Sequence, residues 1–223
     1  HPLNKSLLVH RFKQALALRE ACFSEPYYRL IYGDSDLLPG LVVDRFGDYL
    51  VVQMASAGMD VQKDAIVEAL QKVIKPAAIL LRNDHSARSL EGLEEYVEAI
   101  GDVPEAVELV ENGVRFLAPI AEGQKTGWFY DHRENRAMLQ RLAPGKRVLD
   151  VFSYVGGWGV QAAAAGASEV MCVDVSEQAL EWVGENAHLN GVDETMKGLR
   201  GKAVQVLKEL IAQGEQFDIV VLD

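Results

Sequence analysis

The chain up to about residue 119 shows short apolar stretches separated by turn signals. Apolar residues at helical spacing predict a helix over residues 5–23. Runs of β-branched and aromatic residues predict strands, and helical spacing predicts one more helix. The strands fall at residues 27–32, 41–45, 49–54, 77–81, 107–110 and 114–117, and the helix at residues 59–74. Strands, a helix and further strands in this order indicate a small α+β domain.

From residue 120 onward, helical and strand-like patterns alternate. Helices are predicted in the later part of residues 126–142 and over 157–165, 177–189 and 203–212, and strands over 148–151, 169–173 and 218–222. Alternation of this kind predicts a parallel sheet with right-handed crossovers. The predicted fold class is therefore α/β, with a Rossmann-like domain preceded by the small α+β domain. The predicted domains are residues 1–26 (helix and linker), 27–119 (α+β) and 120–223 (Rossmann-like).

Composition is that of a folded enzyme, with 49% hydrophobic and 25% charged residues. No apolar run is long enough to cross a membrane, and nothing at the start resembles a signal peptide. We therefore expect a cytoplasmic protein without a membrane partner. Two cysteines, Cys22 and Cys172, do not suggest a disulfide framework.

The net charge of −11 argues against a nucleic-acid partner, but the charge is unevenly distributed. Eight acidic residues and no basic one lie between Glu91 and Glu111. Basic residues outnumber acidic ones before Asp34 and again between residues 122 and 147. Each basic stretch is compatible with an RNA contact and equally with an ordinary solvated helix surface.

Two carboxylates mark the ends of the first two strands of the predicted parallel sheet. Asp150 and Asp174 are 24 positions apart, which is the length of a short crossover. Both should therefore emerge at the carboxyl edge of the sheet, where open α/β sheets bind ligands. Each could instead be a structural cap at the end of its strand.

The turn between these strands does not have the spacing of a dinucleotide site. Residues 153–159 read Ser-Tyr-Val-Gly-Gly-Trp-Gly, which is not GxGxxG, and Asp150 before the turn would repel phosphate. S-adenosylmethionine fits better, since it carries a sulfonium, an ammonium and a ribose diol but no phosphate. We assign Asp174 to the ribose hydroxyls and Asp150 to the ammonium through water. The backbone of the turn (Ser153, Tyr154, Gly156 and Gly157) is assigned to the amino-acid and ribose parts. A dinucleotide-dependent oxidoreductase remains an alternative.

At this point the sequence resembles the class I S-adenosylmethionine-dependent methyltransferases. Within them it is similar to the bacterial ribosomal RNA methyltransferases related to the 23S rRNA cytosine-C5 enzyme. Besides the turn, the resemblance is carried by Gly123–Arg136, like the family's Q-K-T-G-x-x-x-D-x-R segment, by Leu37–Asp48, like its L-P-G-L-x-V-D-R-Y-G hairpin, and by Phe217–Asp223, like its fourth strand.

The resemblance implies further site residues. Lys125, Thr126 and Gly127 would close over the methionine end of the cofactor. Asp223, which the family follows with Pro-Pro, is the candidate catalytic residue. Ser176, the expected N-cap of the helix over residues 177–189, is counted with the cofactor-binding residues. The family usually has an acidic adenine contact where this chain has Lys202.

The resemblance also implies an activity, a partner and a longer protein. The expected function is methylation of RNA, at cytosine C5 of ribosomal RNA, with no metal and with a homodimer as one assembly. The alternatives are another acceptor, such as guanine N7 or a small molecule, and a noncatalytic RNA-binding module. The family has an RNA-binding PUA domain upstream and further strands downstream, so we expect the chain to be a fragment whose sheet is incomplete at the C-terminus. Neither Cys22 nor Cys172 suits the nucleophile that cytosine-C5 chemistry requires.

Overall fold

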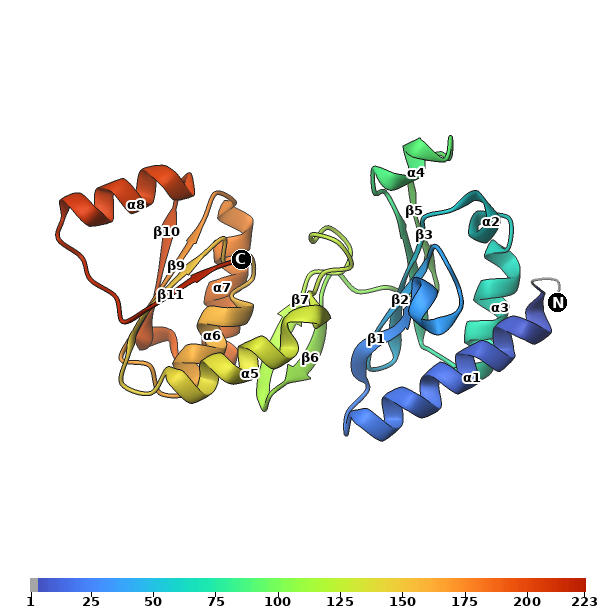
Figure 1. Cartoon of the computed structure of the whole chain (residues 1–223), viewed down its shortest axis with the longest axis horizontal. Helices are drawn as coiled ribbons and strands as arrows, with labels where there is room; N and C mark the ends of the chain where they lie inside the picture. Colours follow the sequence, from blue (N-terminus) through green and yellow to red (C-terminus); the bar gives the residue numbers. More distant parts are fainter. Residues whose placement is uncertain (1–3) are drawn as a thin grey trace. The chain divides into compact units, whose positions relative to one another are not determined.

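The computed structural model describes residues 4–223, which divide into two compact units. The first unit contains the chain up to Leu109 together with Ala118–Tyr130, and the second contains Val110–Leu117 together with Asp131–Asp223. Figure 1 shows the elements of both. The chain passes from one unit to the other at residues 109/110, 117/118 and 130/131. The single domain boundary between residues 119 and 120 stays a prediction.

The first unit is built on a five-stranded sheet with the order β1-β2-β3-β4-β5. Its strands are β1 (Tyr27–Tyr32), β2 (Leu41–Phe46), β3 (Tyr49–Met54), β4 (Ala78–Asn83) and β5 (Tyr96–Ile100). β3 and β4 pair in parallel, and the other neighbours pair antiparallel. The short 3-10 helix η1 (Gly33–Asp36) and helix α4 (Ala87–Leu90) lie in the connections.

Two longer helices complete the core of this unit. Helix α1 (Lys5–Cys22) begins at Asn4, whose side chain accepts a hydrogen bond from the Leu7 N–H at 3.0 Å. It packs against α3 (Lys63–Val73), and both contribute to an apolar core with the sheet (Figure 1). The helix predicted over residues 59–74 is instead two, because the Ser56 side chain caps a separate short helix, α2 (Ala57–Asp60).

The second unit contains a four-stranded, fully parallel sheet with the order β10-β9-β8-β11. Its strands are β8 (Arg147–Val151), β9 (Glu169–Asp174), β10 (Met196–Arg200) and β11 (Ile219–Leu222). The first strand in sequence is therefore central and the chain reverses direction around it, as in a Rossmann-like fold. The prediction of a parallel α/β sheet is confirmed.

Four helices cover the two faces of this sheet (Figure 1). Helices α5 (Arg133–Leu142), α6 (Gly157–Ala164) and α7 (Glu177–Leu189) bury residues such as Leu139, Ala162 and Val183 against one face. Helix α8 (Ala203–Ala212) buries Val206 and Leu210 against the other. Burial on both faces is the reason that the interior positions of β8 and β9 are apolar apart from Asp150.

The remaining elements are short. β6 (Val107–Glu111) and β7 (Val114–Ala118) form a two-stranded hairpin, and the 3-10 helices η2 (Tyr130–His132) and η3 (Asp193–Thr195) precede α5 and β10. Within residues 4–223, no helix has the length and apolarity needed to span a membrane.

Candidate functional site

The loop between β8 and α6 has an unusual backbone at the carboxyl edge of the sheet. Phe152, Tyr154 and Gly156 all have positive φ, at 64°, 49° and 84°. The left-handed region is unfavourable for bulky residues, and such conformations persist only where the surroundings impose them. Here the Val173 carbonyl of β9 accepts hydrogen bonds from the N–H groups of Phe152 (2.9 Å) and Ser153 (3.1 Å). The predicted glycine turn is therefore hydrogen-bonded to the neighbouring strand β9.

Asp174 ends β9 and holds the same loop. Its Oδ2 accepts the Tyr154 N–H and its Oδ1 accepts the Ser176 N–H, both at 2.9 Å. The Ser176 hydroxyl in turn accepts the Ala179 N–H at 3.2 Å, so Ser176 is the N-cap of α7 as predicted. Each carboxylate oxygen of Asp174 has a second lone pair. A structural role for Asp174 is thus compatible with the predicted contact to a ribose diol.

Asp150 is the penultimate residue of β8 in the second unit, where it is wholly buried. Its Oδ2 accepts the Gly159 N–H at 2.9 Å, and its Oδ1 has no hydrogen-bond partner within the described residues. Burial is the main cause that raises the pKa of Asp150 to about 7; the carboxylates of Asp223 and Asp174 contribute to the rise, while the Gly159 N–H and Arg136 oppose it. A buried carboxylate with a spare oxygen is a strong acceptor for a cationic group.

The packing around Asp150 explains the third glycine of the turn. A Cβ on Gly159 would lie 2.7 Å from Cys172 Sγ and 3.1 Å from Asp150 Oδ2, so no larger residue fits. Burial also raises the pKa of the Cys172 thiol well above its ordinary value, as expected for a small buried hydrophobe. Ser153 Oγ is buried nearby and, the Cys172 thiol apart, has no polar partner among residues 4–223. Buried polar atoms without partners point to a ligand or water that completes the site.

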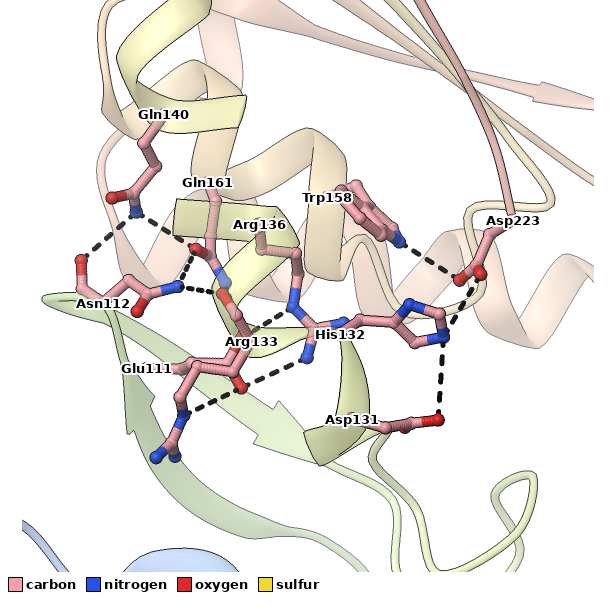
Figure 2. Close-up of polar contacts among 10 residues, drawn as sticks. All are labelled: Glu111, Asn112, Asp131, His132, Arg133, Arg136, Gln140, Trp158, Gln161 and Asp223. Atoms are coloured by element: carbon pink, nitrogen blue, oxygen red, sulfur yellow. Dashed lines mark hydrogen bonds and ion pairs between the residues drawn. The ribbon is translucent and has the colours of Figure 1, made fainter. Parts of the chain in front are cut away.

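Asp223 lies at the carboxyl edge beside these residues, since β11 pairs with β8. Its Oδ2 accepts the indole N–H of Trp158 at 3.1 Å, and its Oδ1 lies 3.4 Å from His132 Nε2 (Figure 2). His132 Nε2 also lies 3.9 Å from the carboxylate of Asp131. The hydrogen bond between Trp158 and Asp223 is a feature that only the structure shows.

A buried polar network supports this corner of the site (Figure 2). The Glu111 carboxylate, at the end of β6, accepts hydrogen bonds from Arg136 Nε at 2.6 Å and from Gln161 Nε2 at 2.9 Å. Arg133 Nε lies 3.7 Å from the same carboxylate. The two arginines of the Gly123–Arg136 segment therefore bind Glu111, and their spacing of three residues on α5 is the sequence signal for a shared partner.

The three residues Lys125, Thr126 and Gly127 belong to the first unit. Thr126 is buried and donates its hydroxyl hydrogen to Asp44 Oδ2 at 2.6 Å, and Asp44 also binds Arg29. Gly127 has a φ of 100°, and a Cβ there would lie 2.9 Å from the Ile120 Cα. The Lys125 ammonium lies 4.3 Å from the centre of the Phe129 ring. This segment has a defined local structure, and its contact with the cofactor stays a prediction.

Within residues 4–223, no group of three or more histidine, cysteine or acidic side chains is arranged to hold a metal ion. The sheet edge presents three carboxylates, from Asp150, Asp174 and Asp223, around the loop between β8 and α6.

Comparison with known proteins identifies the family. A family model described as S-adenosylmethionine-dependent methyltransferase matches residues 82–223. The ribosomal RNA large subunit methyltransferase I of Tolumonas auensis is 41% identical over 228 residues, which cover 99% of this chain and 57% of that protein.

Two solved structures share the fold along the whole chain. A putative S-adenosylmethionine-dependent methyltransferase from Streptococcus mutans has a TM-score of 0.88 at 24% identity and covers 100% of this chain and 59% of that chain. A putative methyltransferase crystallised in complex with SAH has a TM-score of 0.87 at 23% identity, with 100% and 58% covered. At these identities the two structures bear on the fold alone.

The parallel sheet with its central first strand defines a Rossmann-like domain, and the carboxylates at its edge favour a cofactor without phosphates. The chain belongs to the S-adenosylmethionine-dependent methyltransferase family. The predicted family, and with it the class of cofactor, is confirmed. The chain spans a little over half the length of the ribosomal RNA methyltransferase relative described above.

Proposed function

We propose that the protein transfers a methyl group from S-adenosylmethionine to RNA, and that the acceptor is cytosine C5 of ribosomal RNA. The observation that carries the donor half is the acidic sheet edge: Asp150, Asp174 and Asp223 interact electrostatically across adjacent strands. Such an edge repels phosphate and attracts a sulfonium and an ammonium. The acceptor half is supported by the 41% identity to a protein named as a ribosomal RNA methyltransferase.

Different residues of the second unit bind different parts of the methyl donor. The bound cofactor supplies a methyl group on a positively charged sulfur, which is open to in-line displacement. Asp174 accepts hydrogen bonds from the ribose hydroxyls with the lone pairs that Tyr154 and Ser176 leave available. Asp150 offers its unpartnered Oδ1 to the ammonium through water, and the loop of Ser153, Gly156 and Gly157 lets the backbone approach closely. Methyl transfer then depends mainly on holding donor and acceptor at near-attack distance.

The acceptor side rests on Asp223 and on a cysteine that neither Cys22 nor Cys172 provides. Cys172 is buried with a raised pKa, and Cys22 lies on α1 in the first unit. In this proposal Asp223 contacts the acceptor nucleotide, and Lys125, Thr126 and Gly127 cover the methionine end. The nucleophile comes from another segment. RNA as partner, a homodimer as assembly and a cytoplasmic location belong to the same proposal.

Two measurements test the proposal in order. Calorimetric titration with S-adenosylhomocysteine should show micromolar binding, and NAD as control should show none. Incubation of the protein, together with the segment that supplies the nucleophilic cysteine, with tritiated S-adenosylmethionine and unmodified ribosomal RNA should then label the RNA, and nuclease digestion should yield 5-methylcytidine. Binding of NAD in place of S-adenosylhomocysteine would contradict the proposed methyl donor. Label at guanine N7, or no label in RNA, would contradict cytosine C5 as the acceptor.

A further inference from the structure

The carboxylate of Asp223 is held at both oxygens by nitrogen atoms from two other elements. Trp158, on the first turn of α6, donates its indole N–H to Oδ2, and His132, just before α5, faces Oδ1 with Nε2 (Figure 2). The side chains of His132 and Asp223 are 28% and 30% exposed. Each carboxylate oxygen keeps a lone pair for a further donor.

The two nitrogen atoms are themselves held in place. The Arg136 guanidinium lies 5.8 Å from the centre of the Trp158 ring, and Arg136 is fixed by its double hydrogen bond to the buried Glu111. The rings of His132 and Trp158 lie 5.6 Å apart, and Nε2 of His132 also faces Asp131. The carboxylate therefore has one favoured orientation at the sheet edge.

This arrangement adds little to the packing of the second unit. Helices α5 and α6 are already joined by the buried residues Leu139 and Ala162 and by the Glu111 network. Partly exposed ion pairs contribute little to stability. An oriented carboxylate beside the cofactor loop is better explained by what it binds.

We propose that His132 and Trp158 are positioning residues that orient the Asp223 carboxylate toward an N–H group of the acceptor nucleobase. The inference rests on the proposed methyl transfer to RNA and assigns it two residues outside the cofactor site. Exocyclic amino groups, such as that of cytosine, are hydrogen-bond donors, and an ionised carboxylate only accepts. Misorientation of a contact of this kind lowers the rate of the chemical step more than it lowers the affinity for the donor.

Three variants separate orientation from packing. Trp158→Phe keeps the ring against Arg136 and removes only the N–H. His132→Ala removes the imidazole, and His132→Gln restores an N–H donor at similar reach. The matched control is His188→Gln, because His188 also faces a carboxylate, that of Asp193, at 3.1 Å but is 82% exposed at the end of α7.

The experiment uses the protein together with the segment that supplies the nucleophilic cysteine, and it measures kcat for methyl transfer to ribosomal RNA, the Kd for S-adenosylhomocysteine and the Tm of each variant. We expect Trp158→Phe and His132→Ala to lower kcat by about 10- to 100-fold, with Kd and Tm close to those of the parent. His132→Gln should recover most of the loss, and the control should behave as the parent. An active parent whose kcat is unchanged in both variants, or falls only with Kd or Tm, overturns the inference alone. A parent that binds the cofactor and methylates no RNA overturns the proposed acceptor and this inference together.

Discussion

The buried carboxylate of Asp150 makes the stability of the protein depend on pH. In the folded protein its pKa is about 7, against an ordinary value of 3.8. Between these two values the folded state holds a proton that the unfolded chain has lost. The free energy of unfolding therefore falls by about 1.36 kcal/mol per pH unit over this range. The contribution is complete below about pH 4, is lost as the pH rises toward 7, and is constant above that.

Replacing Asp150 with asparagine removes this dependence and keeps the shape. The amide oxygen of Asp150→Asn still accepts the Gly159 N–H, and the side chain cannot ionise. The new amide N–H₂ costs the same at every pH, so it cancels in a comparison between pH values. From about pH 5 to about pH 8 the parent should lose about 3 kcal/mol that the variant keeps.

Urea unfolding of both proteins at about pH 5 and about pH 8 measures this difference directly. Asp102→Asn, at a solvent-exposed position of the first unit, is the control for loss of one negative charge. It should leave the pH dependence of the parent unchanged. Equal pH dependence in the parent and in Asp150→Asn would refute the reasoning, because the folded protein would then hold Asp150 ionised at no cost.

Three further changes have expected outcomes. Asp174→Ala should weaken binding of S-adenosylhomocysteine by about 1–3 kcal/mol in calorimetry, because the ribose hydroxyls lose their acceptor. Gly159→Ala should lower the free energy of unfolding by about 1–3 kcal/mol, because its Cβ would lie 2.7 Å from a buried sulfur; the control Gly184→Ala has open space at its Cβ. Glu111→Ala should cost about 3–5 kcal/mol in urea unfolding, because it leaves the Arg136 guanidinium buried without its carboxylate.

Each outcome has its contrary. Unchanged cofactor affinity in Asp174→Ala would make that residue a loop anchor only. A Gly159→Ala protein as stable as its control would mean that α6 can shift away from β9. Full stability in Glu111→Ala would show that solvent replaces the carboxylate at Arg136.

The elements around the cofactor loop could be predicted from the sequence because their signals are local. An apolar strand, a glycine turn and a serine N-cap follow one another, and the predicted helix over residues 177–189 has the bounds of α7. β10 could not be predicted in this way, since Met196–Arg200 contains a glycine and two basic residues and lies at the edge of the sheet. β5 is a strand at the other sheet's edge, with two of its five positions exposed and none buried.

In the candidate site, too, some residues could be predicted from local sequence signals and others could not. Asp150, Asp174 and the glycines stand at fixed distances from their strands, so the sequence pattern is enough to place them at one edge. The contact of His132 with Asp223 joins residues from separate elements, and no local spacing encodes it. Trp158 follows the glycines directly, but only the fold brings its N–H within hydrogen-bonding distance of Asp223 after β11.

The left-handed backbone of Phe152 and Tyr154 has a consequence for how this loop can be moved between proteins. Each residue in this conformation lowers the stability of the fold by on the order of 1–3 kcal/mol. Hydrogen bonds to the Val173 carbonyl and the Asp174 carboxylate of the next strand offset this strain. The loop is therefore preorganised by residues about 20 positions downstream, and the entropy of ordering it is lost on folding rather than on binding. A graft of the loop alone would relax into other conformations. The smallest portable module is strand, loop, helix and second strand together.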